Sequence, residues 1–291
     1  MNLRGILMKV RAAELMEGGG FKVRRPFPGQ IPDRIVDPFL LIDEMGPAEY
    51  GPGEAVGAPD HPHRGFETVT YMLDGVFEHK DSAGHSGRIA PGDVQWMTAG
   101  SGVVHSEMPS SLIMEKGGRV HGFQIWINLP AKHKMDPPRY QEIPDESIPT
   151  ATSEDGRVSV KIIAGQAMGK NAVIDTHIPI TFQHWIINPG SSHTQEVKAG
   201  LNAMIYVFHG NGLKIDGLKV DDGEMVILHD GDAVKFSLDA DAESHVEFLL
   251  LAGEPIKEPV VRHGPFVMNK PEEIKQAILD FQSGKMGKID S

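Results

Sequence analysis

Two short segments of this 291-residue chain carry side chains that could bind a metal ion. The segment HPHRGFE contains His61 and His63. The segment GVVHSE contains His105 and Glu107. Because alternate side chains of a β-strand point to the same face, each pair would project two donor groups in one direction. Three neutral imidazoles and one carboxylate suit a divalent transition metal and leave two positions of an octahedral shell for reactants.

The two segments can meet only if the chain between them folds back. Residues 66–74 and 86–98 favour strands, and Asp74-Gly75 is a hairpin signal. If these strands pair antiparallel, both ends return to the same mouth of a barrel. A lone HxH pair would be weak support, because the chain has 14 histidines and most histidines are solvated or make one hydrogen bond. The second pair follows a Pro-Gly-Asp turn at residues 91–93 and strengthens the prediction.

Length and composition indicate a globular protein with two domains. A chain of 291 residues exceeds the usual size of one domain. Cysteine is absent, which excludes disulfides, thiolate metal sites and a cysteine nucleophile. The net charge of −12 argues against direct binding of nucleic acid, which needs clustered Lys and Arg. The sequence contains no apolar run of signal-peptide or membrane-span length, so we expect a cytoplasmic protein without membrane attachment.

Further strands are expected on either side of the metal motif. Residues 21–27 and 39–45 read as strands before it, and residues 120–129 place alternate apolar side chains on one face and should close a first barrel. Residues 130–149 contain five prolines among charged residues, which excludes a helix interior or a central strand. We interpret this stretch as the connection between domains.

The second half of the chain repeats spacings of the first. The pattern Tyr71-x3-Gly75 matches Tyr206-x3-Gly210. Two glycines eight residues apart, at 92 and 100, match two at 223 and 231. This alignment predicts a duplicated barrel. It places Glu196 and Lys198 at the positions of His61 and His63. It places Phe236 and Leu238 at the positions of His105 and Glu107. A cation and two apolar groups cannot hold a metal, so we expect a second barrel with a structural or interaction role.

The last part of the chain predicts a helix. Ile274, Ala277, Ile278 and Phe281 recur at i, i+3, i+4 and i+7, with Pro271 in the first turn. This apolar stripe should pack on a barrel wall, and an interface with a partner is the alternative.

Three longer motifs resemble one family. The order of HxH, a turn and a returning histidine resembles the metal motif of cupin barrels. The motifs HPHRGFETVTYMLDG, PGDVQWMTAGSGVVHSEMP and EPVVRHGPFVMN resemble the pirin family more closely. The resemblance implies an all-β fold of two tandem cupin-type (double-stranded β-helix) barrels with a short C-terminal helix. The expected parts are a metal-binding barrel, a proline-rich connection, a barrel without metal ligands, and a tail with the helix, at residues 1–130, 131–158, 159–255 and 256–291.

The resemblance also implies which residues bind the metal. In the pirin pattern the ligands are His61, His63, His105 and Glu107. In many other cupins the carboxylate ligand comes from HxH-x3-E, which here would be Glu67. We follow the pirin pattern and expect Glu67 to accept a hydrogen bond from an imidazole, which would orient that ligand. One divalent metal per chain is expected, iron(II) before other transition metals.

The activity implied by the resemblance is that of a quercetin 2,3-dioxygenase. A flavonol, or a similar flat aromatic molecule, would lose its 3-hydroxyl proton to Glu107 as the catalytic base, and dioxygen would open the heterocycle with release of carbon monoxide. The alternative is a non-enzymatic, iron-dependent adaptor that binds a transcription regulator or a metabolic enzyme. Repeated turnover with carbon monoxide release would distinguish the enzyme from the adaptor.

Overall fold

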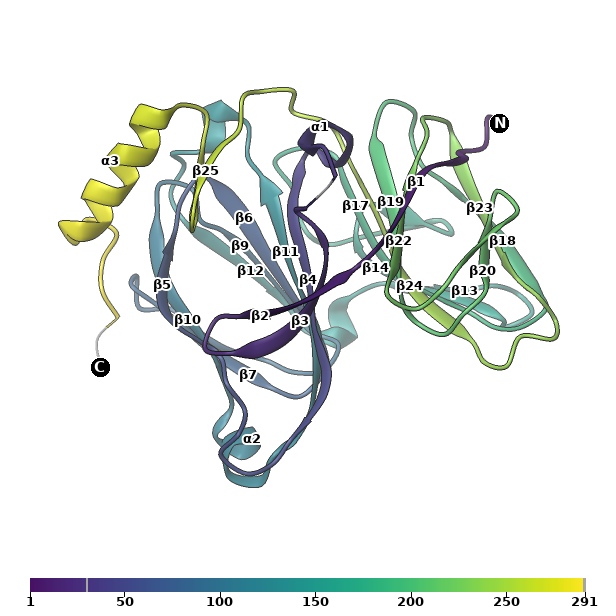
Figure 1. Cartoon of the computed structure of the whole chain (residues 1–291), viewed down its shortest axis with the longest axis horizontal. Helices are drawn as coiled ribbons and strands as arrows, with labels where there is room; N and C mark the ends of the chain where they lie inside the picture. Colours follow the sequence, from purple (N-terminus) through teal and green to yellow (C-terminus); the bar gives the residue numbers. More distant parts are fainter. Residues whose placement is uncertain (30, 290–291) are drawn as a thin grey trace. The chain divides into compact units, whose positions relative to one another are not determined.

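The computed structural model describes residues 1–29 and 31–289 (Figure 1). The chain forms two compact units. The unit that we call the first-barrel unit comprises Glu14–Arg25, Phe39–Asp145 and Ile256–Ser291. The second-barrel unit comprises Met1–Ala13, Pro26–Pro38 and Glu146–Pro255.

The first-barrel unit is built from two antiparallel sheets. The larger sheet has the strand order β12-β9-β6-β11-β4-β3-β2, and the smaller has the order β5-β10-β7-β8. The strands of the larger sheet are β2 (Ala13–Glu17), β3 (Phe21–Phe27), β4 (Phe39–Tyr50), β6 (Phe66–Asp74), β9 (Val94–Thr98), β11 (Gly118–Asn128) and β12 (Arg139–Ile143). Those of the smaller sheet are β5 (Ala58–His63), β7 (Phe77–Asp81), β8 (Ser86–Ile89) and β10 (Val103–Pro109). Short helical segments are α2 (Ser111–Lys116) and η1 (Ala131–His133).

The centre of the larger sheet separates polar from apolar side chains. Residue pairing between β6 and β11 sets Gln124 opposite Thr70 and Ile125 opposite Val69. Because paired residues of neighbouring strands point to the same side, Thr70 and Gln124 share one face, while Val69 and Ile125 share the other. The alternation expected for residues 120–129 is therefore present, and Phe123, Ile125 and Ile127 are buried.

The second-barrel unit has the same construction. Its larger sheet has the order β1-β22-β19-β24-β17-β14-β13, and its smaller sheet has the order β18-β23-β20-β21. The larger sheet contains β1 (Ile6–Arg11), β13 (Thr150–Thr152), β14 (Val158–Ala164), β17 (Ile180–Ile187), β19 (Asn202–His209), β22 (Glu224–Leu228) and β24 (Val246–Gly253). The smaller sheet contains β18 (Ser191–Glu196), β20 (Leu213–Ile215), β21 (Leu218–Val220) and β23 (Ala233–Leu238). The remaining short elements are α1 (Asp33–Val36), η2 (Asp145–Ser147), β15 (Gln166–Ala167) and β16 (Lys170–Asn171).

The duplication expected from sequence is confirmed by the strand orders. Tyr71 lies in β6 and Tyr206 lies in β19, and these strands hold equivalent places in the two larger sheets. The glycines that follow them adopt the same left-handed conformation, with φ of 82° at Gly75 and 81° at Gly210. Only glycine adopts this conformation without a steric cost, so the repeated spacing encodes a repeated turn.

The compact units are not continuous along the chain, in contrast to the four consecutive parts expected. Strand β1 belongs to the second-barrel unit, where it pairs with β22. The corresponding place beside β9 is taken by β12, which follows the first barrel in sequence. The tail belongs to the first-barrel unit. These assignments depend on edge pairing between distant segments, which local sequence patterns do not specify.

The structure also corrects the alignment of the two barrels. His193 pairs with Phe236 between β18 and β23, as His61 pairs with His105 between β5 and β10. His193 and Gln195 therefore occupy the places of His61 and His63, and Glu196 and Lys198 do not. The sequence alignment placed this strand three residues out of register, because none of the matched tyrosines and glycines lies in it. Phe236 and Leu238 still take the places of His105 and Glu107, so the equivalent metal site is incomplete.

The tail packs against the first barrel, as expected. It forms the hairpin of β25 (Val261–His263) and β26 (Phe266–Met268) and then the helix α3 (Pro271–Gln282), drawn in yellow in Figure 1. Ile274 and Ala277 are buried in an apolar cluster with Val104 of β10. Phe281, which we expected in the same stripe, is 40% exposed. The helix buries a narrower face than its sequence periodicity predicted.

Candidate metal centre

Three histidines converge where β5 pairs with β10. His61 lies opposite His105, and His63 lies opposite Val103 in the same ladder. The ring centroids of His61 and His105 are 4.4 Å apart, those of His61 and His63 are 4.7 Å apart, and those of His63 and His105 are 5.0 Å apart. One ring nitrogen from each histidine lies within 4.8 Å of the other two. The three histidines therefore lie together, and a direct cross-strand pair of His61 and His105 produces this arrangement.

The imidazole nitrogens are in the state that a metal requires. His105 is fully buried, and neither of its ring nitrogens has a hydrogen-bond partner. The buried Nδ1 of His63 also has none. His61 places Nδ1 2.7 Å from the Pro59 carbonyl oxygen, which leaves Nε2 for a ligand. Buried polar atoms without partners are costly, and a metal ion would satisfy these atoms. The residues therefore fit a divalent metal.

Burial also keeps two of these histidines neutral. It lowers the pKa of His63 well below the usual value, and the neighbouring imidazoles His105 and His61 lower it further. It lowers the pKa of His105 in the same way, with contributions from His61 and His79. A metal binds the neutral imidazole, so protons do not compete at these two positions near pH 7.

Glu107 lies on β10 two residues after His105 and reaches across the barrel interior. Its Oε1 accepts a hydrogen bond from Thr70 Oγ1 at 2.7 Å, and its Oε2 accepts one from Gln124 Nε2 at 2.8 Å. Thr70 and Gln124 belong to the larger sheet, so the carboxylate links the two sheets. The group of donor atoms within 4.8 Å of one another consists of the three histidines, and Glu107 lies outside it. Its role as the fourth ligand stays a prediction.

Glu67 lies on the other face of the larger sheet. It pairs with Ile127 across β6 and β11, whereas Thr70, which holds Glu107, belongs to the opposite face of β6. Its carboxylate accepts a hydrogen bond of 2.6 Å from Thr98 Oγ1. Regular alternation from His63 would place Glu67 on the ligand face, but Gly65, with φ of 88°, interrupts the alternation. This placement disfavours the predicted contact between Glu67 and an imidazole.

Three residues near the site were not identified from the sequence. Thr70 and Gln124 orient Glu107, and the Trp126 ring lies 5.3 Å from that of His63 between centroids. The signal was present in the runs TVTYM and FQIWI, where a polar side chain interrupts an apolar strand. Such polar residues face the barrel interior, and only the pairing of β6 with β11 shows that they face it together.

The tail motif, residues 258–269, contacts the chain directly after His63, where β5 ends. The Val267 N–H donates to the Arg64 carbonyl at 3.1 Å, and the Arg64 N–H donates to the Pro265 carbonyl at 3.3 Å. His63 also hydrogen-bonds the backbone of Pro265. A Cβ on Gly65 would lie 2.1 Å from the Val267 carbonyl oxygen, so glycine is required there. Two of the three family-like motifs therefore contact each other, although about 200 residues separate them.

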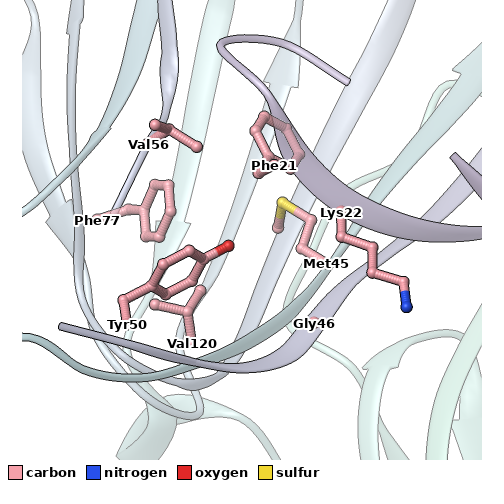
Figure 2. A pocket seen from close by; sticks show the side chains of 8 residues that line it. All are labelled: Phe21, Lys22, Met45, Gly46, Tyr50, Val56, Phe77 and Val120. Atoms are coloured by element: carbon pink, nitrogen blue, oxygen red, sulfur yellow. The ribbon is translucent and has the colours of Figure 1, made fainter. Parts of the chain in front are cut away.

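A pocket elsewhere in the first-barrel unit does not involve these ligands (Figure 2). It encloses about 10 Å³, room for roughly one water molecule. Its lining is mostly apolar, with the Tyr50 ring among Met45 and Val120. The full lining is Phe21, Lys22, Met45, Gly46, Tyr50, Val56, Phe77 and Val120. A pocket of this size cannot take an aromatic substrate.

Two tandem double-sheet barrels, one with a three-histidine cluster between paired strands, define a two-cupin protein with a candidate divalent-metal site. A family model described as Pirin matches residues 20–127, and a model described as the Pirin C-terminal cupin domain matches residues 182–287. The chain belongs to the pirin family.

Relatives match over nearly the whole chain. A pirin-like protein of Solanum lycopersicum is 44% identical over 286 residues, which cover 98% of this chain and 93% of the relative. Human pirin is 42% identical over 286 residues, which cover 97% of this chain and 93% of the relative. A solved structure of quercetin 2,3-dioxygenase from Acinetobacter baumannii is similar with a TM-score of 0.92 and 36% identity, covering 99% of this chain and 100% of that one.

Proposed function

We propose that this protein is a metal-dependent dioxygenase of the quercetin 2,3-dioxygenase type. The main observation is the set of buried imidazole nitrogens without hydrogen-bond partners on His63 and His105. Glu107 lies on the same strand as His105, β10. The similarity to a solved quercetin 2,3-dioxygenase supports the same proposal. Buried nitrogen atoms without a partner are energetically costly, and a bound metal ion would remove this cost.

The proposed metal is iron(II), one ion in the first barrel. His61, His63 and His105 would hold it through one nitrogen each, and Glu107 would be the fourth ligand. When bound, the ion would bring dioxygen and a substrate oxygen together, because a mixed nitrogen and carboxylate shell leaves positions open.

Glu107 is the proposed base. Both of its carboxylate oxygens accept hydrogen bonds, from Thr70 and from Gln124, so the side chain is held as a proton acceptor. A substrate hydroxyl near either oxygen could transfer its proton there. Thr70 and Gln124 are positioning residues in this proposal, because they act through Glu107.

A flat aromatic substrate suits the rings around His63. The Phe66 ring centroid lies 5.1 Å from that of His63, and the rings of Phe66 and Trp126 are 4.5 Å apart. Trp126 is only partly buried. Aromatic rings stack on one another with a favourable energy beyond area burial, about 0.5–1.5 kcal/mol per pair. We propose a flavonol or a molecule of similar shape.

The decisive experiment is a turnover count. Anaerobic protein loaded with ferrous iron is mixed with quercetin and then exposed to air, and carbon monoxide is measured per chain. We expect many turnovers for the wild type and for His85→Ala, and none for His105→Ala. His85 is a suitable control because its side chain is 59% exposed. A single turnover or no turnover in the wild type would overturn the proposal of an enzyme. It would favour the alternative, an iron-dependent adaptor that binds a protein partner.

None of the helices in the described part of the chain is long and apolar enough to cross a membrane. We propose a cytoplasmic location, which fits a cysteine-free chain. Fractionation of the native host with antibody detection would test it, and recovery in the membrane or secreted fraction would contradict it.

A further inference from the structure

A second cluster of metal-binding side chains lies in the second-barrel unit. His209 ends β19, Glu247 lies opposite it in β24, and His245 comes just before β24. The ring centroids of His209 and His245 are 4.8 Å apart. One donor atom from each of these three residues lies within 4.8 Å of the other two. The sequence alone gave no reason to group them, because 35 residues separate the two histidines.

The backbone beside His209 packs closely against the backbone of His245. Gly210 follows His209 with φ of 81°, and a Cβ on it would lie 2.3 Å from the His245 carbonyl oxygen. Only glycine lets the turn after β19 contact the backbone of His245 in this way. The two histidine rings are brought together by this contact.

Glu247 is oriented from two sides. His245 Nε2 lies 3.1 Å from its Oε1, and His184 Nε2, on β17, lies 2.9 Å from its Oε2. His184 is buried, and its ring packs 5.1 Å from that of Phe208. Metal sites typically contain residues that hydrogen-bond a ligand and so orient it. A buried histidine bonded to the second oxygen of a carboxylate ligand can have this role.

This cluster is not a remnant of the duplicated metal site. The positions equivalent to the first-barrel histidines are held by His193, Gln195 and Phe236, on β18 and β23. In the new cluster His209 and Glu247 lie on β19 and β24, which belong to the other sheet of the barrel.

We propose that His209, His245 and Glu247 bind a divalent transition-metal ion, with zinc as the best fit and water as the fourth ligand. In a tetrahedral site with bonds of about 2.1 Å, donor atoms lie about 3.4 Å apart. The His245 and Glu247 donor atoms lie 3.1 Å apart, close to this spacing. His209 is exposed, so its ring can rotate into place. The side chain of His245 is 39% exposed, so an ion can enter from solvent.

Such an ion would link residues on either side of a long segment of the chain. Residues 210–244 form β20 to β23 between His209 and His245, and one of these strands, β22, pairs with β19 in the same sheet. An ion that binds only the folded chain stabilises it in proportion to the logarithm of its concentration over the dissociation constant. The proposed role is therefore a clip that stabilises the second barrel.

The first test counts metal ions. Tag-free protein is stripped of metal, dialysed against buffered zinc and analysed for zinc per chain. We expect His209→Gln and His245→Gln each to bind one equivalent fewer than the wild type, and His105→Ala to lose a different equivalent. His229→Gln is the matched control, because His229 is an exposed histidine of the same unit. A wild type that binds one equivalent, or variants that bind as much zinc as the wild type, would overturn the proposal.

The second test measures thermal unfolding with and without zinc. Zinc should raise the melting temperature of His105→Ala, in which the first-barrel site is lost. It should not do so when His209→Gln is added to that variant. Circular dichroism of the metal-free proteins checks that the variants are folded. An unchanged zinc effect in the double variant would overturn the proposal. None of these outcomes depends on dioxygenase activity, so the test is independent of the proposed function.

Discussion

Arg64 and Asp280 form a buried ion pair that joins the end of β5 to the last helix, α3. Arg64 Nη1 lies 2.9 Å from Asp280 Oδ2, and Arg64 Nε donates to the Ser101 carbonyl oxygen at 2.7 Å. Arg64 directly follows the proposed ligand His63, and Asp280 lies in α3. Since both residues are largely shielded from water, the pair fixes the tail against the edge of the metal centre.

Loss of this pair should release the tail. Asp280→Asn removes the charge opposite a buried guanidinium, which leaves Arg64 with an uncompensated positive charge. We expect faster tryptic cleavage in residues 270–291 and weaker metal retention. The matched control is Glu272→Gln, an exposed carboxylate of the same helix, which should behave as the wild type. Equal cleavage rates for Asp280→Asn and Glu272→Gln would show that the pair does not hold the helix.

The same pair should make the tail sensitive to acid. Hydrogen bonds from Lys285, Gln276 and Arg64 hold the pKa of Asp280 well below its usual value of 3.8. Because the folded pKa is lowered, the stabilisation is complete above pH 3.8 and is lost as the pH falls from there toward the folded pKa. Pepsin should therefore cut the tail increasingly fast between about pH 4 and pH 2, and this increase should be smaller in Asp280→Asn.

His105→Ala should abolish metal binding in the first barrel. His105 contributes two buried nitrogens without hydrogen-bond partners, and its removal breaks the three-histidine group. We expect a loss of at least ~100-fold in iron affinity, since losing even a neighbour of a ligand costs 10–100-fold. Iron content after dialysis and carbon monoxide release are the measurements. If His105→Ala keeps wild-type iron and rate, His105 is a core residue.

Glu107→Gln and Glu67→Gln should differ strongly. Glu107→Gln keeps the size of the side chain but removes the proposed base, so turnover should fall by ~100-fold or more. Glu67→Gln should have a small effect on turnover, because Glu67 lies on the opposite face of β6 and bonds Thr98. Steady-state rates of iron-loaded proteins test this order. A Glu67→Gln protein more impaired than Glu107→Gln would mean that this chain follows the general cupin pattern.

Thr70 should act through Glu107. Thr70→Val removes the hydroxyl that donates to Glu107 Oε1 at 2.7 Å while it keeps a similar volume. We expect a fall in kcat of ~10-fold or more, with little change in KM and an unchanged melting temperature. Thr70→Ser restores the hydroxyl and should recover most of the rate. Equal rates in the Val and Ser variants would show that Thr70 only fills space.

The amino-acid sequence determined the local parts of this protein. Alternating side chains predicted strands such as β11, and the spacing of Tyr71 and Gly75 against Tyr206 and Gly210 predicted the duplicated barrel. The two donor pairs were visible because alternation places i and i+2 on one face. These features depend on residues that lie a few positions apart in the chain, so short sequence patterns are enough to predict them.

The tertiary structure decided everything that depends on strand register. It placed His193, and not Glu196, opposite Phe236. It turned Glu67 away from Thr70. It brought Arg64 to Asp280 and His209 to His245. A shift of one residue in pairing moves every side chain of a strand to the other face, and the packing of both sheets selects the register. Side chains from distant parts of the chain meet only after that selection, so their contacts could not be predicted from local patterns.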